Sequence, residues 1–162
     1  MELEEIKKLF QKKLSEDEKI KLLGHTAGSI ICILAKHLIN SSGYRVISTI
    51  LMREVKNLGK KDGEKIIKIF DIKRNDKESA SMILKILAYN LGLELKTENG
   101  ETIVTKCPYG ESVRETGIPF ICSICVEYNK GVVEAVLGPD FTIEKTKYLL
   151  TDNVCSFNIK RK

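Results

Sequence analysis

Residues 93–107 read LELKTENGETIVTKC, and the change of pattern in this stretch decides the fold class. Apolar and polar residues alternate from Leu93 to Thr97, as they do in a strand with one buried face. Asn99-Gly100 is typical of a two-residue type I′ turn, and residues 102–106 resume the alternation. The stretch therefore predicts a β-hairpin.

The residues before the hairpin predict helices, because apolar residues recur at intervals of three and four positions. A first pair of helices is expected over residues 3–14 and from a Ser15–Glu18 capping box to Leu23. We expect the Gly24–Gly28 segment to break this pattern and to begin a strongly apolar helix that extends to Ile39. That helix is expected to be buried on most sides.

Two further helices are predicted before residue 92. One extends from Tyr44 to Leu58 and is expected to end at Gly59 as a C-cap, and the other extends from about Glu78 to Leu91. Between them, residues 66–70 fit either a helix or a strand.

The residues after the hairpin predict a turn-rich loop to Pro119, a helix from Phe120 to Gly138, and strands at Phe141–Thr146 and Val154–Ile159. No linker or repeat divides the chain, so residues 1–162 are expected to form a single α+β domain. Residues 1–91 form its mainly helical half, packed on an antiparallel sheet of about four strands. Residues 92–162 supply the sheet and the helix that crosses it.

Composition limits the function classes. The net charge of +5 arises from Lys and Glu mixed along the chain, as on a solvated surface, so direct nucleic-acid binding is not expected. No apolar run is expected to span a bilayer and no secretory signal is recognised, which together predict a cytoplasmic location. Abundant Ile and Lys, one Gln and no Trp are typical of proteins from hot environments.

Five cysteines without an export signal are expected to be reduced thiols. Cys122 and Cys125 form a Cys-x-x-Cys motif that would place both sulfurs on one face of a helix, while Cys107 and Cys155 belong to strands. Four thiolates would make a closed, structural zinc site. The alternatives are inert core thiols, which is the state expected for Cys32, and a redox pair, which would require a strand where the chain has a Gly/Pro loop.

A ligand pocket is the other site to consider. Its candidate residues, each equally explained as core or cap, are His25, Tyr44, Tyr89 and Phe120. The chain has no Gly-x-Gly-x-x-Gly motif after a strand, no flavin signature and no recognisable nucleophile motif. Enzyme activity is therefore not the expected function.

The stretch from Cys107 to the C-terminus resembles the 4-vinyl reductase domain family, also called hydrocarbon-binding domains. In that family a cysteine at a helix start is followed by a Gly-containing helix, an acidic residue and a segment similar to Gly-Asp-x-x-Cys-x-Phe. The residues that match in this order are Cys125, Gly131, Glu144 and the segment TDNVCSF at 151–157.

Two positions depart from the family pattern. Lys147 stands where the family often has a second cysteine, and Thr151 stands in place of the glycine. The resemblance implies a metal set of cysteines and a glutamate, so Cys107 and Cys122 are expected to supply what Lys147 removes, as in related archaeal regulators. Glu144 is then either a displaced metal ligand or a plain strand residue.

The resemblance also implies the fold of transport-particle subunits and phenol-sensor domains, the NO-signalling/Golgi-transport ligand-binding type. Members hold a small apolar or aromatic molecule between helices and sheet, usually as homodimers. The expected function is a ligand-binding sensor or regulatory domain with structural zinc. The alternatives are an interaction subunit that binds a lipid or a partner protein, and an enzyme related to vinyl reductases.

Overall fold

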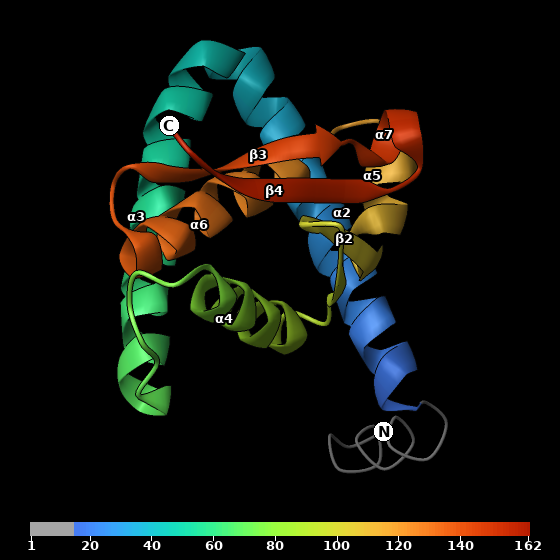
Figure 1. The fold of residues 1–162 in the computed structure, drawn as a ribbon. Helices are drawn as coiled ribbons and strands as arrows, with labels where there is room; N and C mark the ends of the chain where they lie inside the picture. The colour runs from blue at the N-terminus through green and yellow to red at the C-terminus, as the bar shows by residue number, and fades with distance from the viewer. Residues whose placement is uncertain (1–14) are drawn as a thin grey trace, which may run out of the picture.

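In the computed structural model, which describes residues 15–162, helices pack around a four-stranded antiparallel sheet (Figure 1). The helix predicted over residues 3–14 lies outside the described part. The predicted α+β class is confirmed. The elements in chain order are α2 (Glu16–Ser42), α3 (Tyr44–Phe70), α4 (Lys77–Asn90), β1 (Glu94–Glu98), β2 (Glu101–Lys106), α5 (Gly110–Thr116), α6 (Phe120–Leu137), β3 (Phe141–Lys147), α7 (Leu149–Asp152) and β4 (Cys155–Arg161).

The sheet has the order β1-β2-β4-β3, and every neighbouring pair is antiparallel. Asn99 and Gly100 have φ values of 51° and 79°, so both have the positive φ that the predicted type I′ turn requires. Helix α6 packs on α3, α4 and β3. The main core forms there, and its fully buried members include Ile83, Val132 and Val133.

Helix α2 begins at the predicted capping box. Ser15 Oγ accepts from the Glu18 N–H at 3.3 Å, and the Ser15 N–H donates to Glu18 Oε2 at 2.8 Å. The predicted break at Gly24–Gly28 is wrong, because the helix continues through both glycines. A Cβ on Gly24 would lie 2.3 Å from Pro108 Cβ, so the absent side chain permits close packing on the segment before α5.

Helix α3 also continues where the sequence predicts an end. Gly59 is an interior residue, and a Cβ there would lie 2.0 Å from the Tyr128 carbonyl oxygen of α6. Gly131 of α6 faces α3 in the same way, with a Cβ position 1.9 Å from the Lys56 carbonyl oxygen. The glycines therefore allow two helix backbones to touch, and α3 ends instead at Asp71 with φ of 48°.

The predicted burial of the apolar stretch of α2 is wrong for most of its large side chains. Its buried residues are small, namely Gly24, Gly28, Cys32 and Ala35, whereas Leu23 is 72% and Leu34 is 56% exposed. By length and composition α2 is apolar enough to cross a membrane, contrary to the sequence expectation, and 22% of its apolar window is buried. Core helices and signal sequences meet the same criterion, so this is weak support for a membrane span.

The second half follows its predicted order with two additions. Helix α6 begins at Phe120 and ends before Gly138 as expected, and β3 and β4 occupy the two predicted strand segments. The loop predicted after Cys107 contains the short helix α5, and the short helix α7 lies between β3 and β4. Figure 1 shows α5 and α7 at one end of the sheet and α3 at the other.

Candidate ligand cavity

A cavity of about 610 Å³ lies between the helices and the sheet. Its apolar walls come from α3, α4, both strands of the hairpin, and β3 and β4. The wall side chains include Leu58, Leu84, Leu87, Leu95, Val104, Ile143 and Phe157. The volume lies within the range of about 300–1,000 Å³ that small-molecule sites occupy.

Four of the five cysteines line this cavity together. Cys122 and Cys125 come from the first turns of α6, Cys107 follows β2, and Cys155 begins β4. All four are free thiols. Cys32 lies apart from them, completely buried beside Val113, Ile121 and Leu149, as expected of a core thiol.

Burial keeps the cavity thiols protonated. It raises the pKa of Cys122 to about 11 and that of Cys125 to about 12, and neighbouring thiols add to both effects. Burial also raises the pKa of Cys107, opposed by the backbone N–H groups of Tyr109 and Gly110 and more weakly by Arg114. It raises the pKa of Cys155 as well, opposed by Lys145. Thiols in this state become good metal ligands only when a cation displaces their protons.

The predicted zinc site can be compared with this arrangement. Thiols are the donors that structural zinc prefers, and the four predicted ligands share one cavity. Within residues 15–162, however, no three Cys, His, Asp or Glu side chains are grouped to hold an ion. Glu144 is not among the lining residues, and its carboxylate pairs with Lys160 Nζ at 2.6 Å.

The polar lining of the cavity is sparse. Tyr128 Oη donates a hydrogen bond to Asp62 Oδ2 at 3.0 Å, which links α6 to α3. Arg114 of α5 is exposed, lines the cavity, and forms no ion pair with any other residue of the described part. These residues were not predicted from the sequence, although Tyr128 follows Cys125 by three positions in the helix and so shares its face.

The four predicted pocket residues lie elsewhere. His25 Nε2 is 2.9 Å from Glu115 Oε2, Tyr44 is exposed, and Phe120 is buried in the core. Tyr89 is 80% exposed and lines a separate groove of about 440 Å³ between α3 and α4. The structure therefore brings none of the four to the lining of the large cavity.

The fold is shared with solved structures of low sequence identity. The phenol-responsive sensory domain of the transcription activator PoxR, determined with phenol, matches with a TM-score of 0.65 and 15% identity, over 83% of this chain and 74% of that one. A trafficking protein particle complex subunit 3 from Naegleria fowleri, covalently bound to palmitic acid, matches with a TM-score of 0.61 and 18% identity, over 89% and 95%. The predicted fold type is thereby confirmed.

No protein-family model and no curated protein sequence matches the chain. Its relation to the 4-vinyl reductase domain family therefore stays a prediction.

Proposed function

We propose that this chain is a sensor or regulatory module that binds a small apolar or aromatic molecule in the cavity between its helices and its sheet. The observation that carries the proposal is an apolar cavity of about 610 Å³ whose walls come from both halves of the chain. Both structural neighbours are described with an organic molecule bound, phenol in one and palmitic acid in the other.

A ligand bound in this cavity would raise the stability of the folded chain. It would contact α4 on one side and the β2–β4 pair on the other, and it would remove apolar wall surface from water. A ligand that binds only the folded state stabilises it by about 2.7 kcal/mol at one hundred times its dissociation constant.

The test is thermal unfolding of the purified chain with phenol, indole and dodecanoic acid, each titrated separately. We expect at least one compound to raise Tm in the wild type and to lose this effect in Val104→Phe, which fills part of the cavity. Ile69→Phe, at a 70% exposed position of α3, is the control and should respond as the wild type does. If no compound shifts Tm and organic extracts of the purified chain contain none, the proposal fails.

A structural zinc ion on Cys107, Cys122, Cys125 and Cys155 is part of the same proposal. It is supported by the donor chemistry and by the shared cavity, and it requires the four thiols to turn toward one another. The thiols must be reduced to bind zinc, which requires a reducing compartment. The proposed zinc site therefore includes the prediction of a cytoplasmic location.

Metal analysis tests the zinc ion directly. We expect about one zinc per chain after purification without chelator, and loss of both metal and thermal stability in Cys107→Ser and in Cys155→Ser. Cys32→Ser is the matched control and should keep the metal, because that thiol lies outside the cavity. A metal-free wild type whose five thiols all react on unfolding would exclude the ion.

A second candidate function is assembly, favoured by the exposed face of α2. Leu23, Ile30, Leu34 and Leu38 are each at least 46% exposed and share one face at helical spacing. No Asp, Glu, Lys or Arg lies between Lys21 and Lys36. In an antiparallel pair of α2 helices centred on this face, the acidic first turn of one copy would lie opposite the C-terminal end of α2 in the other, which is followed by Arg45 in the first turn of α3.

The occupant of this face is thus proposed to be a second copy of the chain. Light scattering after size exclusion should give a dimer for the wild type and a monomer for Leu34→Lys, with Ile69→Lys as an exposed control on α3. A monomeric wild type would exclude the pair, and flotation of that monomer with lipid vesicles would assign the face to a membrane surface instead.

A further inference from the structure

The cavity lining has two charged side chains among the described residues, Arg114 of α5 and Asp62 of α3, and they lie beside different parts of helix α6. Cys122 and Cys125 line it in the first two turns, where Cys122 packs against the buried cluster that includes Val113 of α5, and Tyr128 and Asn129 line it further along, next to α3. With a rise of about 1.5 Å per residue, Cys122 and Asn129 are about 10 Å apart along the helix axis. Figure 1 shows α5 and α7 at the opposite end of the sheet from α3.

The end next to α5 is positive. Arg114 lines the cavity there and is the only basic side chain among the described lining residues. No carboxylate of the described lining lies at this end.

The end next to α3 is negative. Asp62 is the only acidic side chain among the described lining residues, and its carboxylate accepts from Tyr128 Oη at 3.0 Å. Lys65 Nζ lies 3.4 Å from the other carboxylate oxygen, on the outer side, where it is 70% exposed. An anion in the cavity is therefore attracted by Arg114 and repelled by Asp62, so one orientation is favoured.

We infer that the natural ligand is a carboxylic acid with an extended apolar body, its carboxylate held by Arg114 and its body laid along the apolar walls toward Tyr128. The guanidinium presents paired N–H donors that match a carboxylate. This inference rests on the proposed function and narrows it from apolar molecules in general to acids. It applies to the metal-free chain, because a zinc ion on four thiolates would give the α5 end of the cavity a net charge of −2. The acid is bound free, not as a thioester of a cavity cysteine.

Paired test ligands separate the carboxylate from the apolar body. Isothermal titration of the delipidated, metal-free chain should show dodecanoic acid binding about tenfold more tightly than 1-dodecanol. Arg114→Gln should remove this preference while it keeps the affinity for 1-dodecanol, and Arg114→Lys should retain part of it. Arg53→Gln, at an exposed arginine outside the cavity that pairs with Glu54, is the matched control. Higher salt should reduce the preference in the wild type.

Equal affinities for the two ligands in the wild type, or an unchanged preference in Arg114→Gln, would overturn the inference and leave the proposed function standing. The same holds if intact mass after denaturation shows an acyl group bound to the chain. Failure of dodecanoic acid, 1-dodecanol and phenol alike to bind would overturn the proposed function as well.

Discussion

At the scale of single residues, Cys125 is a cavity thiol whose pKa is strongly raised by burial. Burial raises its pKa from the ordinary value of 9.0 to about 12. The folded chain therefore holds this proton between pH 9 and 12 while the unfolded chain has released it, so the free energy of unfolding falls as pH rises through that window.

Urea unfolding of the metal-free protein at pH 8 and pH 10.5 tests this linkage. Wild type should lose more stability than Cys125→Ala between the two values, by about 1 kcal/mol per pH unit above 9. Parallel losses in the two proteins would contradict the raised pKa.

Gly131 is a second residue with a disproportionate role, because it lets α6 touch the backbone of α3. A Cβ there would lie 1.9 Å from the Lys56 carbonyl oxygen. This oxygen belongs to the backbone of a helix, so it cannot move aside as a flexible side chain can. We expect Gly131→Ala to lower the free energy of unfolding by about 3 kcal/mol or more. Gly63→Ala is the graded control, since its Cβ would meet Ala135 Cβ at 3.1 Å and its cost is offset by better helix propensity. Equal effects in urea unfolding would be inconsistent with this explanation.

At the scale of elements, the boundaries that were predicted correctly are those that a few neighbouring residues determine. The capping box of α2, the type I′ turn and the end of α6 at Gly138 each depend on a few adjacent residues. The helix breaks predicted at Gly24 and Gly59 were wrong, because these glycines depend on contacts that are not local. Those glycines are explained by contacts with Pro108 and Tyr128, which are distant in sequence.

The turn of the β1–β2 hairpin can be tested by substitution of its two residues, Asn99 and Gly100. Gly100 has φ of 79° with open space around its Cβ position, so Gly100→Ala tests backbone strain without a clash. We expect this substitution to lower stability by about 1 kcal/mol. Asn99→Gly, at φ of 51°, should be tolerated, because glycine adopts that conformation readily. Thermal unfolding of both variants provides the measurement, and a neutral Gly100→Ala would argue against the type I′ turn.

At the scale of the whole molecule, the cavity could be predicted only in part. The Cys-x-x-Cys spacing indicated that Cys122 and Cys125 share a face, and both line the cavity with Cys107 and Cys155. The apolar walls and Arg114 could not be predicted, because residues from all ten described helices and strands line the cavity and no local pattern distinguishes a cavity wall from core. Aromatic residues such as Tyr89 were predicted as walls from their type alone, and the packing of α4 turns that ring outward.

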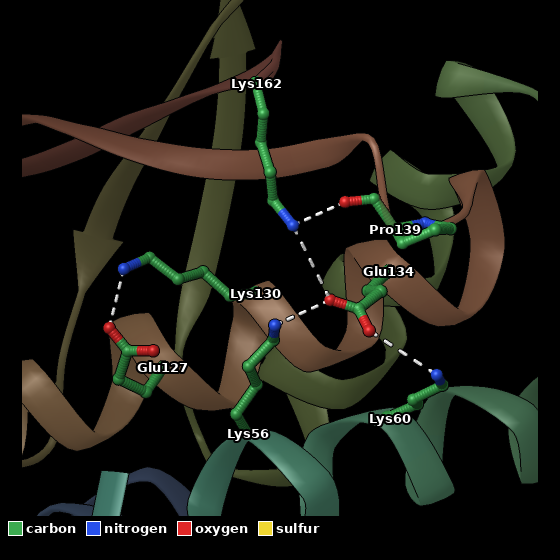
Figure 2. A network of polar contacts seen from close by, with 7 residues as sticks. All are labelled: Lys56, Lys60, Glu127, Lys130, Glu134, Pro139 and Lys162. Carbon is green, nitrogen blue, oxygen red and sulfur yellow. Dashed lines mark hydrogen bonds and ion pairs between the residues drawn. The ribbon is translucent and has the colours of Figure 1, made fainter. Parts of the chain in front are cut away.

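Glu134 joins three parts of the molecule at one carboxylate. Its oxygens lie 2.6 Å from Lys56 Nζ and 3.4 Å from Lys60 Nζ, both on α3, and 3.9 Å from Lys162 Nζ at the C-terminal end of the chain (Figure 2). The carboxylate side chain is only 14% exposed. The hydrogen bond from Lys56 holds the pKa of Glu134 below its ordinary value of 4.5.

A depressed carboxyl pKa contributes stability that is present above pH 4.5 and is lost as pH falls through the folded value. Glu134→Gln should therefore lower the free energy of unfolding by about 1–2 kcal/mol at pH 7, since three ammonium groups lose their shared anion, and the difference should shrink below pH 4. Glu127→Gln is the matched control in Figure 2, because within residues 15–162 Glu127 pairs with Lys130 alone, on the same helix, at 2.6 Å. A pair of that kind contributes about 0.5 kcal/mol or less. Equal losses in the two variants would mean that Glu134 acts as an ordinary surface charge, so the link between α3, α6 and the end of β4 would have to come from apolar packing alone.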